Sequence, residues 1–108
     1  MRLKEIAMYL ELEKPIEIQI KTKKKKTMHA AYWGMYDEYG ELKYHLIRVY
    51  GFEQYRGFES LIAHELIHGW QEEKHIDEIH GPHFQQKARE IEHHFKIENV
   101  YIPGVDID

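Results

Sequence analysis

At 108 residues, with 43% hydrophobic and 13% aromatic side chains, the chain can form one domain around one core, which excludes a disordered polypeptide. It contains no cysteine, which excludes disulfides and cysteine-ligated metal sites. No apolar run approaches the roughly 20 residues needed to span a bilayer, and no secretory signal follows the first residue, so we expect one cytoplasmic domain over residues 1–108.

The first half of the sequence predicts a helix followed by a small sheet. Apolar residues at helical spacing precede Pro15, and alternating or aromatic-rich segments follow it. The predicted elements are a helix over residues 2–12, strands over residues 16–20, 28–36 and 42–50, and a hairpin loop over residues 37–41. In the last strand Leu42, Tyr44 and Leu46 alternate with Lys43 and His45, and apolar residues occupy both faces from Ile47 to Tyr50.

The second half predicts two helices, over residues 57–73 and 82–96. Residues 100–102 either add a short strand or pack against the core. The expected fold class is therefore α+β, with an N-terminal helix, a small, mostly antiparallel sheet and two further helices packed against it.

Residues 64–68, His-Glu-Leu-Ile-His, form an HExxH sequence within the first of these two helices. Histidines four residues apart lie on one helical face, close enough to bind one metal ion together. Glu65 between them is suited to act as general base toward a water molecule that zinc activates. His64, Glu65 and His68 project on one half of the helix and apolar residues on the other. The pattern predicts a helix that is buried on one side and borders a cleft on the other.

A third metal ligand is expected because catalytic zinc usually has three protein ligands and one open position. Residues 80–84 read His-Gly-Pro-His-Phe, in which glycine permits a sharp turn and proline suits the first position of a helix. Extrapolated back by one turn, the apolar stripe of that helix places His80 toward the first helix and His83 on the polar side. The sequence thus predicts one zinc ion per chain, bound by His64, His68 and His80.

Other zinc sites fit the sequence less well. The metzincin pattern requires a glycine and a histidine where Gln71 and Lys74 stand. A carboxylate ligand from the second helix, Glu90 or Glu92, would lie off the apolar stripe or at its edge. His75 belongs to a polar connection and is expected in solvent.

The sequence HELIH, then Trp70-Gln71, a short polar connection and HGPHF, resembles the SprT-like metallopeptidase family, which includes the DNA–protein crosslink protease Spartan. The resemblance implies a zincin-like fold, with His64, His68 and His80 as zinc ligands and Glu65 as the catalytic residue. Many members carry a C-terminal zinc ribbon, which this chain lacks, so the chain looks like a minimal form.

Zincin-like peptidases suggest two further roles. In these enzymes the strand bordering the cleft pairs with an extended substrate, and by resemblance we assign residues 42–50 to that edge. An interior strand with no substrate contact is the alternative. Many zinc peptidases also use a side chain to stabilise the oxyanion, for which His83, Tyr50 and Tyr101 are candidates that the sequence does not separate.

A lysine run suggests nucleic acid as a partner. Lys23, Lys24, Lys25 and Lys26 can neutralise phosphates, and the resemblance to Spartan makes DNA a candidate. The chain nevertheless has a net charge of −4 and no second basic cluster. A solvated hairpin tip is the commoner explanation for such a run.

Two functions are compatible with these residues. The first is a zinc endopeptidase that acts on a protein or peptide substrate, with DNA-associated proteins as candidates and no membrane partner. The second is a catalytically silent, zinc-stabilised binding or adaptor domain. Glu65 favours the peptidase, because a structural site needs no base beside an open metal position. Closure of that position by His83 or His75 would indicate an inactive domain.

Overall fold

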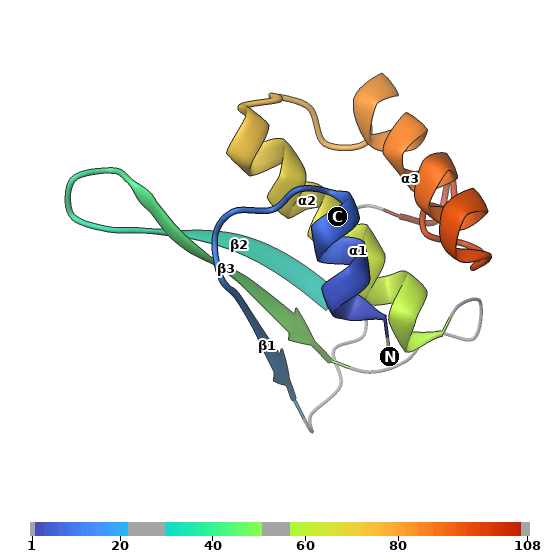
Figure 1. The fold of residues 1–108 in the computed structure, drawn as a ribbon, viewed down its shortest axis with the longest axis horizontal. Helices are drawn as coiled ribbons and strands as arrows, with labels where there is room; N and C mark the ends of the chain where they lie inside the picture. The colour runs from blue at the N-terminus through green and yellow to red at the C-terminus, as the bar shows by residue number, and fades with distance from the viewer. Residues whose placement is uncertain (1, 22–29, 51–56, 107–108) are drawn as a thin grey trace.

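The computed structural model describes residues 2–21, 30–50 and 57–106, which form an α+β fold of three helices and a three-stranded mixed sheet. In chain order the elements are α1 (Leu3–Tyr9), β1 (Ile16–Ile20), β2 (Ala30–Tyr36), β3 (Leu42–Val49), α2 (Phe58–Lys74) and α3 (Pro82–Phe95). The helices lie on one side of the sheet (Figure 1). Helix α2 contacts β2 and β3 directly, and α1 and α3 pack against α2. The helix that carries HExxH is therefore the centre of the fold.

The predicted elements agree with the observed ones to within a few residues, except at α1. The helix predicted to reach residue 12 ends at Tyr9, because Glu11 adopts a left-handed backbone conformation with φ of 56°. No strand forms around residue 100. Val100 is instead fully buried in the core, which confirms the packing alternative.

The sheet differs from the expectation in its strand order, which is β1-β3-β2. Strands β2 and β3 form the predicted antiparallel hairpin, but β1 runs parallel to β3, so the sheet is mixed rather than mostly antiparallel. The assignment of residues 42–50 to the sheet edge was wrong, because β3 has a hydrogen-bonded strand on each side. The alternative of an interior strand is confirmed. Among the described strands, β2 is the edge that borders α2.

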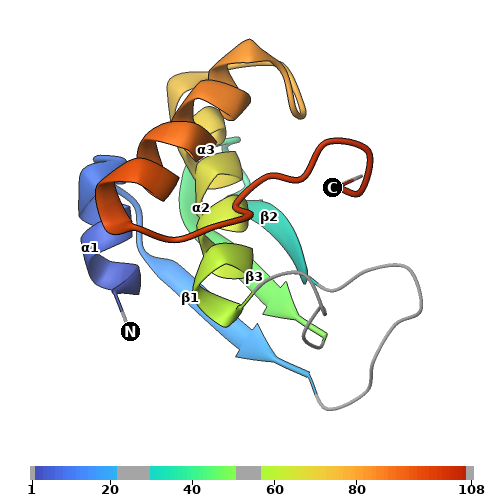
Figure 2. The same ribbon diagram turned by 90° about the vertical axis from the view of Figure 1, so that its right-hand side faces the viewer.

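The core fills the space between the sheet and the helices. Its buried members are Ile6, Leu10, Ala30, Ile47, Val49, Leu61, Ile62, Ala63, Leu66, Ile67, Phe84, Ala88, Ile91, Phe95 and Val100. The apolar stripe predicted for α3 is buried as expected. Helix α2 is buried on both halves, since His64 is only 3% and Glu65 only 1% exposed. The segment after α3 passes across α2 (Figure 2), and Val100 and Asp106 in this segment lie against His64.

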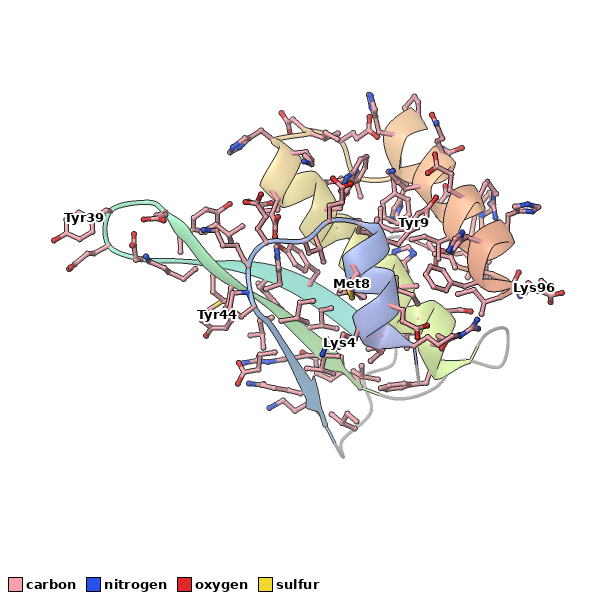
Figure 3. The ribbon with its side chains drawn as sticks, in the orientation of Figure 1. Lys4, Met8, Tyr9, Tyr39, Tyr44 and Lys96 are labelled. Carbon is pink, nitrogen blue, oxygen red and sulfur yellow. The ribbon has the colours of Figure 1, made fainter. Side chains whose placement is uncertain are left out.

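The β2–β3 hairpin extends beyond the helices, with Tyr39 at its tip (Figure 3). Asp37 shapes the turn: its Oδ1 accepts hydrogen bonds from the backbone N–H groups of Tyr39, at 2.8 Å, and Glu41, at 3.0 Å. Gly40 has a φ of 80°, which favours glycine. The turn lies at the predicted place. No described helix is long and apolar enough to cross a membrane.

Candidate metal centre

The rings of His64, His68 and His80 form a nearly equilateral triangle. Their centroids are 5.1 Å (His64–His68), 5.0 Å (His64–His80) and 5.3 Å (His68–His80) apart. One nitrogen of each ring lies within 4.8 Å of the other two, and this is the one group of potential ligands that the described residues form. The structure thus brings together the three predicted residues, and they can hold a metal ion.

The spacing of the nitrogens fits a tetrahedral ion. The Nε2 atoms of His64 and His80 are 3.2 Å apart. Two nitrogens bound about 2.0–2.1 Å from a tetrahedral zinc ion are separated by about 3.3–3.4 Å. This pair of nitrogens is therefore already close to the spacing that a shared metal ion requires. An all-imidazole donor set suits zinc and neighbouring transition metals rather than calcium or magnesium.

Residues that follow α3 orient His64. Its Nδ1 lies 2.7 Å from the backbone oxygen of Val100, so Nδ1–H donates to that carbonyl and Nε2 is the nitrogen for the metal. The Asp106 carboxylate lies 3.6 Å from the same Nδ1 and accepts a hydrogen bond from the backbone N–H of Ile102 at 2.6 Å. A carbonyl and a carboxylate beside Nδ1 increase the basicity of the opposite nitrogen.

Gln71 links His68 to the loop that carries His80. The side-chain oxygen of Gln71 lies 2.9 Å from Nδ1 of His68, which assigns Nε2 of His68 to the metal as well. The amide nitrogen of Gln71 donates to the backbone oxygen of Ile79 at 3.3 Å. One buried side chain therefore fixes the orientation of one ligand and the position of the next.

The turn that holds His80 is stabilised by a carboxylate that caps α3. Glu78 accepts a hydrogen bond from the backbone N–H of Phe84 at 3.0 Å and lies 3.2 Å from Nδ1 of His83. A Cβ atom at residue 81 would lie 2.6 Å from the Glu78 carboxylate, so Gly81 permits this close approach without a shift of Glu78. Burial opposes ionisation here, but the bonds from Phe84 and His83 outweigh it and lower the pKa of Glu78.

Phe84 forms an apolar floor below the three histidines. Its ring centroid lies 4.8 Å from that of His64, 4.7 Å from that of His68 and 4.8 Å from that of His80. The side chain is fully buried. Phe84 therefore shields the site from water on that side and restricts the rotation of each ring.

Glu65 and His68 border a cleft of about 400 Å³ between α2 and the edge strand β2. Residues 31–33 of β2 form one wall, and the loop after α2 forms part of another. The predicted general base thus lies at a cleft beside the metal ligands.

Among the described residues, His83, His75 and Glu90 do not join the three histidines in the group that could hold a metal ion. The side chain of His83 is 63% exposed, as predicted, and His75 is exposed at the C-terminal end of α2. Glu90 accepts hydrogen bonds from Tyr9 and Lys87.

Glu92 stabilises the site through the backbone of residue 100. It accepts a hydrogen bond from the Val100 N–H at 2.9 Å and forms an ion pair with Arg89. The Arg89 guanidinium also donates to the Tyr101 carbonyl.

Of the candidates for oxyanion stabilisation, Tyr101 lies beside the histidine cluster, with its ring centroid 5.1 Å from that of His80. The side chain of His83 faces solvent, and Tyr50 is buried just after the end of β3. Lys23, Lys24, Lys25 and Lys26 lie outside the described residues.

The residues that orient the three histidines were not predicted from the sequence. Gln71 could have been found, because it lies three residues after His68 and hence on the same helical face. The contacts from Val100 and Asp106 could not, because they depend on how the segment after α3 folds back.

Comparisons with protein-family models, with curated proteins and with solved structures give no significant match.

Proposed function

We propose that the chain is a zinc-dependent endopeptidase of the SprT-like, zincin-like type. The observation that carries the proposal is the convergence of His64, His68 and His80 beside Glu65 at the end of a cleft. A glutamate adjacent to a three-histidine site is typical of hydrolytic zinc centres. Among the described residues the group consists of these three histidines, and catalytic zinc usually combines three protein ligands with one open position.

The mechanism assigns the proton transfers to Glu65. A bound zinc ion supplies Lewis-acid chemistry, which makes water more acidic and stabilises negative charge on the peptide oxygen. Glu65 accepts a proton as water adds to the carbonyl carbon. It then donates that proton to the amine when the carbon–nitrogen bond breaks. Because Glu65 is 1% exposed, little bulk water competes for this proton.

Strand β2 is the proposed binding site for the substrate backbone. It is the edge strand of the sheet next to α2, and residues 31–33 line the cleft together with Glu65 and His68. An extended peptide placed along this edge would form main-chain hydrogen bonds and bring a scissile carbonyl to the site. Such binding depends little on side chains, which agrees with an unfolded protein as substrate.

The experiment that tests the proposal combines metal analysis with cleavage of casein, which is unstructured. Zinc content is measured on the purified protein, and cleavage is compared among wild type, Glu65→Gln and Glu59→Gln. Glu59 is a matched control because it lies on the same helix but pairs with Arg2, away from the cleft. We expect one zinc per chain in all three proteins. Cleavage should fall by about 10³-fold or more in Glu65→Gln alone.

Other results would change the conclusion. Zinc without cleavage in wild type would favour the binding or adaptor domain, and absence of zinc would refute the metal site.

Single-stranded DNA in parallel assays tests whether DNA-associated proteins are the substrate class. Stimulation that declines steeply with salt, and that disappears when Lys23 to Lys26 are changed to Gln, would support DNA as a partner. Flat salt dependence would exclude it.

A further inference from the structure

A partly buried chain of hydrogen bonds connects the cleft to Glu73, near the C-terminal end of α2. The hydroxyl of Tyr32 on β2 lies 2.7 Å from Nδ1 of His45 on β3. Nε2 of His45 lies 2.6 Å from the carboxylate of Glu73 on α2. Glu73 also accepts hydrogen bonds from the backbone N–H groups of Glu13 and Lys14. Three elements and the segment before β1 are thereby joined through polar atoms.

These hydrogen-bonded side chains lie where apolar packing would ordinarily suffice to hold the sheet against α2. His45 is 0% exposed and lies between the sheet and α2. Burying a histidine and a carboxylate is costly, and replacing such pairs by apolar residues of similar volume is often neutral or stabilising. Gly69 follows the ligand His68 and permits the approach, because a Cβ atom there would lie 3.1 Å from Nδ1 of His45. The helix thus contains a glycine next to a metal ligand, at a position where glycine is unfavourable.

The chain of hydrogen bonds ends at Tyr32, which connects the edge strand β2 to the metal site. Tyr32 lines the cleft with Glu65 and His68, and its ring centroid lies 6.4 Å from that of His68. We propose, on the basis of the proposed peptidase function, that Tyr32, His45 and Glu73 are positioning residues. They hold β2 at the distance from His68 at which a bound peptide reaches the metal. This would make them determinants of substrate binding rather than of metal binding.

The electrostatics favour a positioning role over proton transfer. Burial, together with the nearby carboxylates of Glu72 and Glu73, raises the pKa of Tyr32 above its usual value. The phenol therefore stays neutral. Because a carboxylate only accepts, Nε2–H of His45 donates to Glu73, and in the neutral ring Nδ1 is then left to accept from the Tyr32 hydroxyl. This assignment fixes one tautomer of His45.

Tyr32→Phe is the first test, because it removes one hydroxyl and keeps the ring. Tyr44→Phe is its matched control: Tyr44 precedes His45 on β3, so its side chain lies on the opposite face of the sheet, away from the helices (Figure 3). In zinc-loaded protein we expect amide hydrogen exchange over β2 to be about tenfold faster in Tyr32→Phe than in the control. On casein, KM should rise several-fold with a smaller change in kcat and unchanged zinc content. Equal exchange in both variants, or uniformly faster exchange throughout the core, would overturn the proposal.

A second test does not depend on cleavage. Glu73→Met keeps a side chain of similar length but removes the carboxylate oxygen that accepts hydrogen bonds from Nε2–H of His45 and from the Lys14 N–H. The tautomer should then switch to Nδ1–H, visible in the ¹⁵N NMR shifts of the His45 ring, and β2 should exchange faster. An unchanged tautomer would overturn the proposal. If wild type binds zinc but cleaves nothing, the proposed peptidase function fails. Amide hydrogen exchange and the NMR shifts of His45 still decide whether the hydrogen-bond chain holds β2 in place.

Discussion

Replacing Gly69 by alanine sets two energies of opposite sign against each other. Alanine is favoured over glycine inside a helix by about 1 kcal/mol. The added methyl group, however, would lie 3.1 Å from Nδ1, 3.3 Å from Cε1 and 3.4 Å from Cγ of His45. His45 must then move by a few tenths of an ångström. It is held at 2.7 Å by Tyr32 and at 2.6 Å by Glu73, so movement lengthens at least one buried bond.

The cost of that movement exceeds the gain in helix propensity. A buried hydrogen bond to a charged partner contributes about 1.5–3 kcal/mol, and one between neutral groups about 0.5–1.5 kcal/mol. Partial loss of both outweighs the gain, so we expect Gly69→Ala to lower the free energy of unfolding by roughly 1–2 kcal/mol. The measurement is urea unfolding of the zinc-loaded protein.

A double-mutant cycle isolates the cause. In a His45→Ala background the methyl group has space, and Gly69→Ala should become stabilising by about 1 kcal/mol. The coupling energy between the two positions is then about 2–3 kcal/mol. If the two changes are additive within about 0.5 kcal/mol, or if Gly69→Ala stabilises wild type, the contact with His45 does not explain the glycine.

The remaining predictions concern the metal and the pH dependence of stability. His80→Ala should lower zinc affinity by at least about 100-fold, whereas His83→Ala should change it less than about threefold; equal losses would refute the assignment of ligands. Removing zinc with a chelator should abolish cleavage and lower the midpoint of thermal unfolding, both restored by added zinc. Tyr101→Phe should lower kcat about 10- to 100-fold with little change in KM if its hydroxyl stabilises the oxyanion, and an unchanged kcat would exclude that role. Burial opposes ionisation of Glu73, but hydrogen bonds from Glu13, His45 and Lys14 outweigh it and lower its pKa. Its contribution to stability is therefore present above the unfolded-state pKa of about 4.5 and is lost as the pH falls through the lower folded-state value, a loss that should be smaller in Glu73→Gln.

Local geometry explains why most of the metal centre could be predicted. The four-residue spacing of His64 and His68 places both on one helical face whatever the rest of the fold does. The phase of the apolar stripe on α3 then separates His80 from His83. Both inferences use helical periodicity alone, and the structure agrees with both.

Tertiary pairing explains what could not be predicted. The edge strand depends on which strands pair, and the alternation within residues 42–46 does not distinguish an edge strand from a central one. In β3 the apolar Tyr44 and Leu46 alternate with His45, yet it is His45 that faces α2 and is fully buried. Its burial depends on Tyr32 and Glu73, which are distant in sequence, so strand periodicity could not indicate it.

The contact between His64 and the backbone of Val100 has a consequence for synthesis on the ribosome. A nascent chain that has emerged as far as residue 99 already contains HExxH and His80. It still lacks the Val100 carbonyl and the Asp106 carboxylate, which orient His64. Domains generally fold as units once their residues have emerged. The full affinity for metal should therefore arise only after α3 and the segment that follows it have been made. If the proposed peptidase function holds, its activity would then arise only in the folded domain.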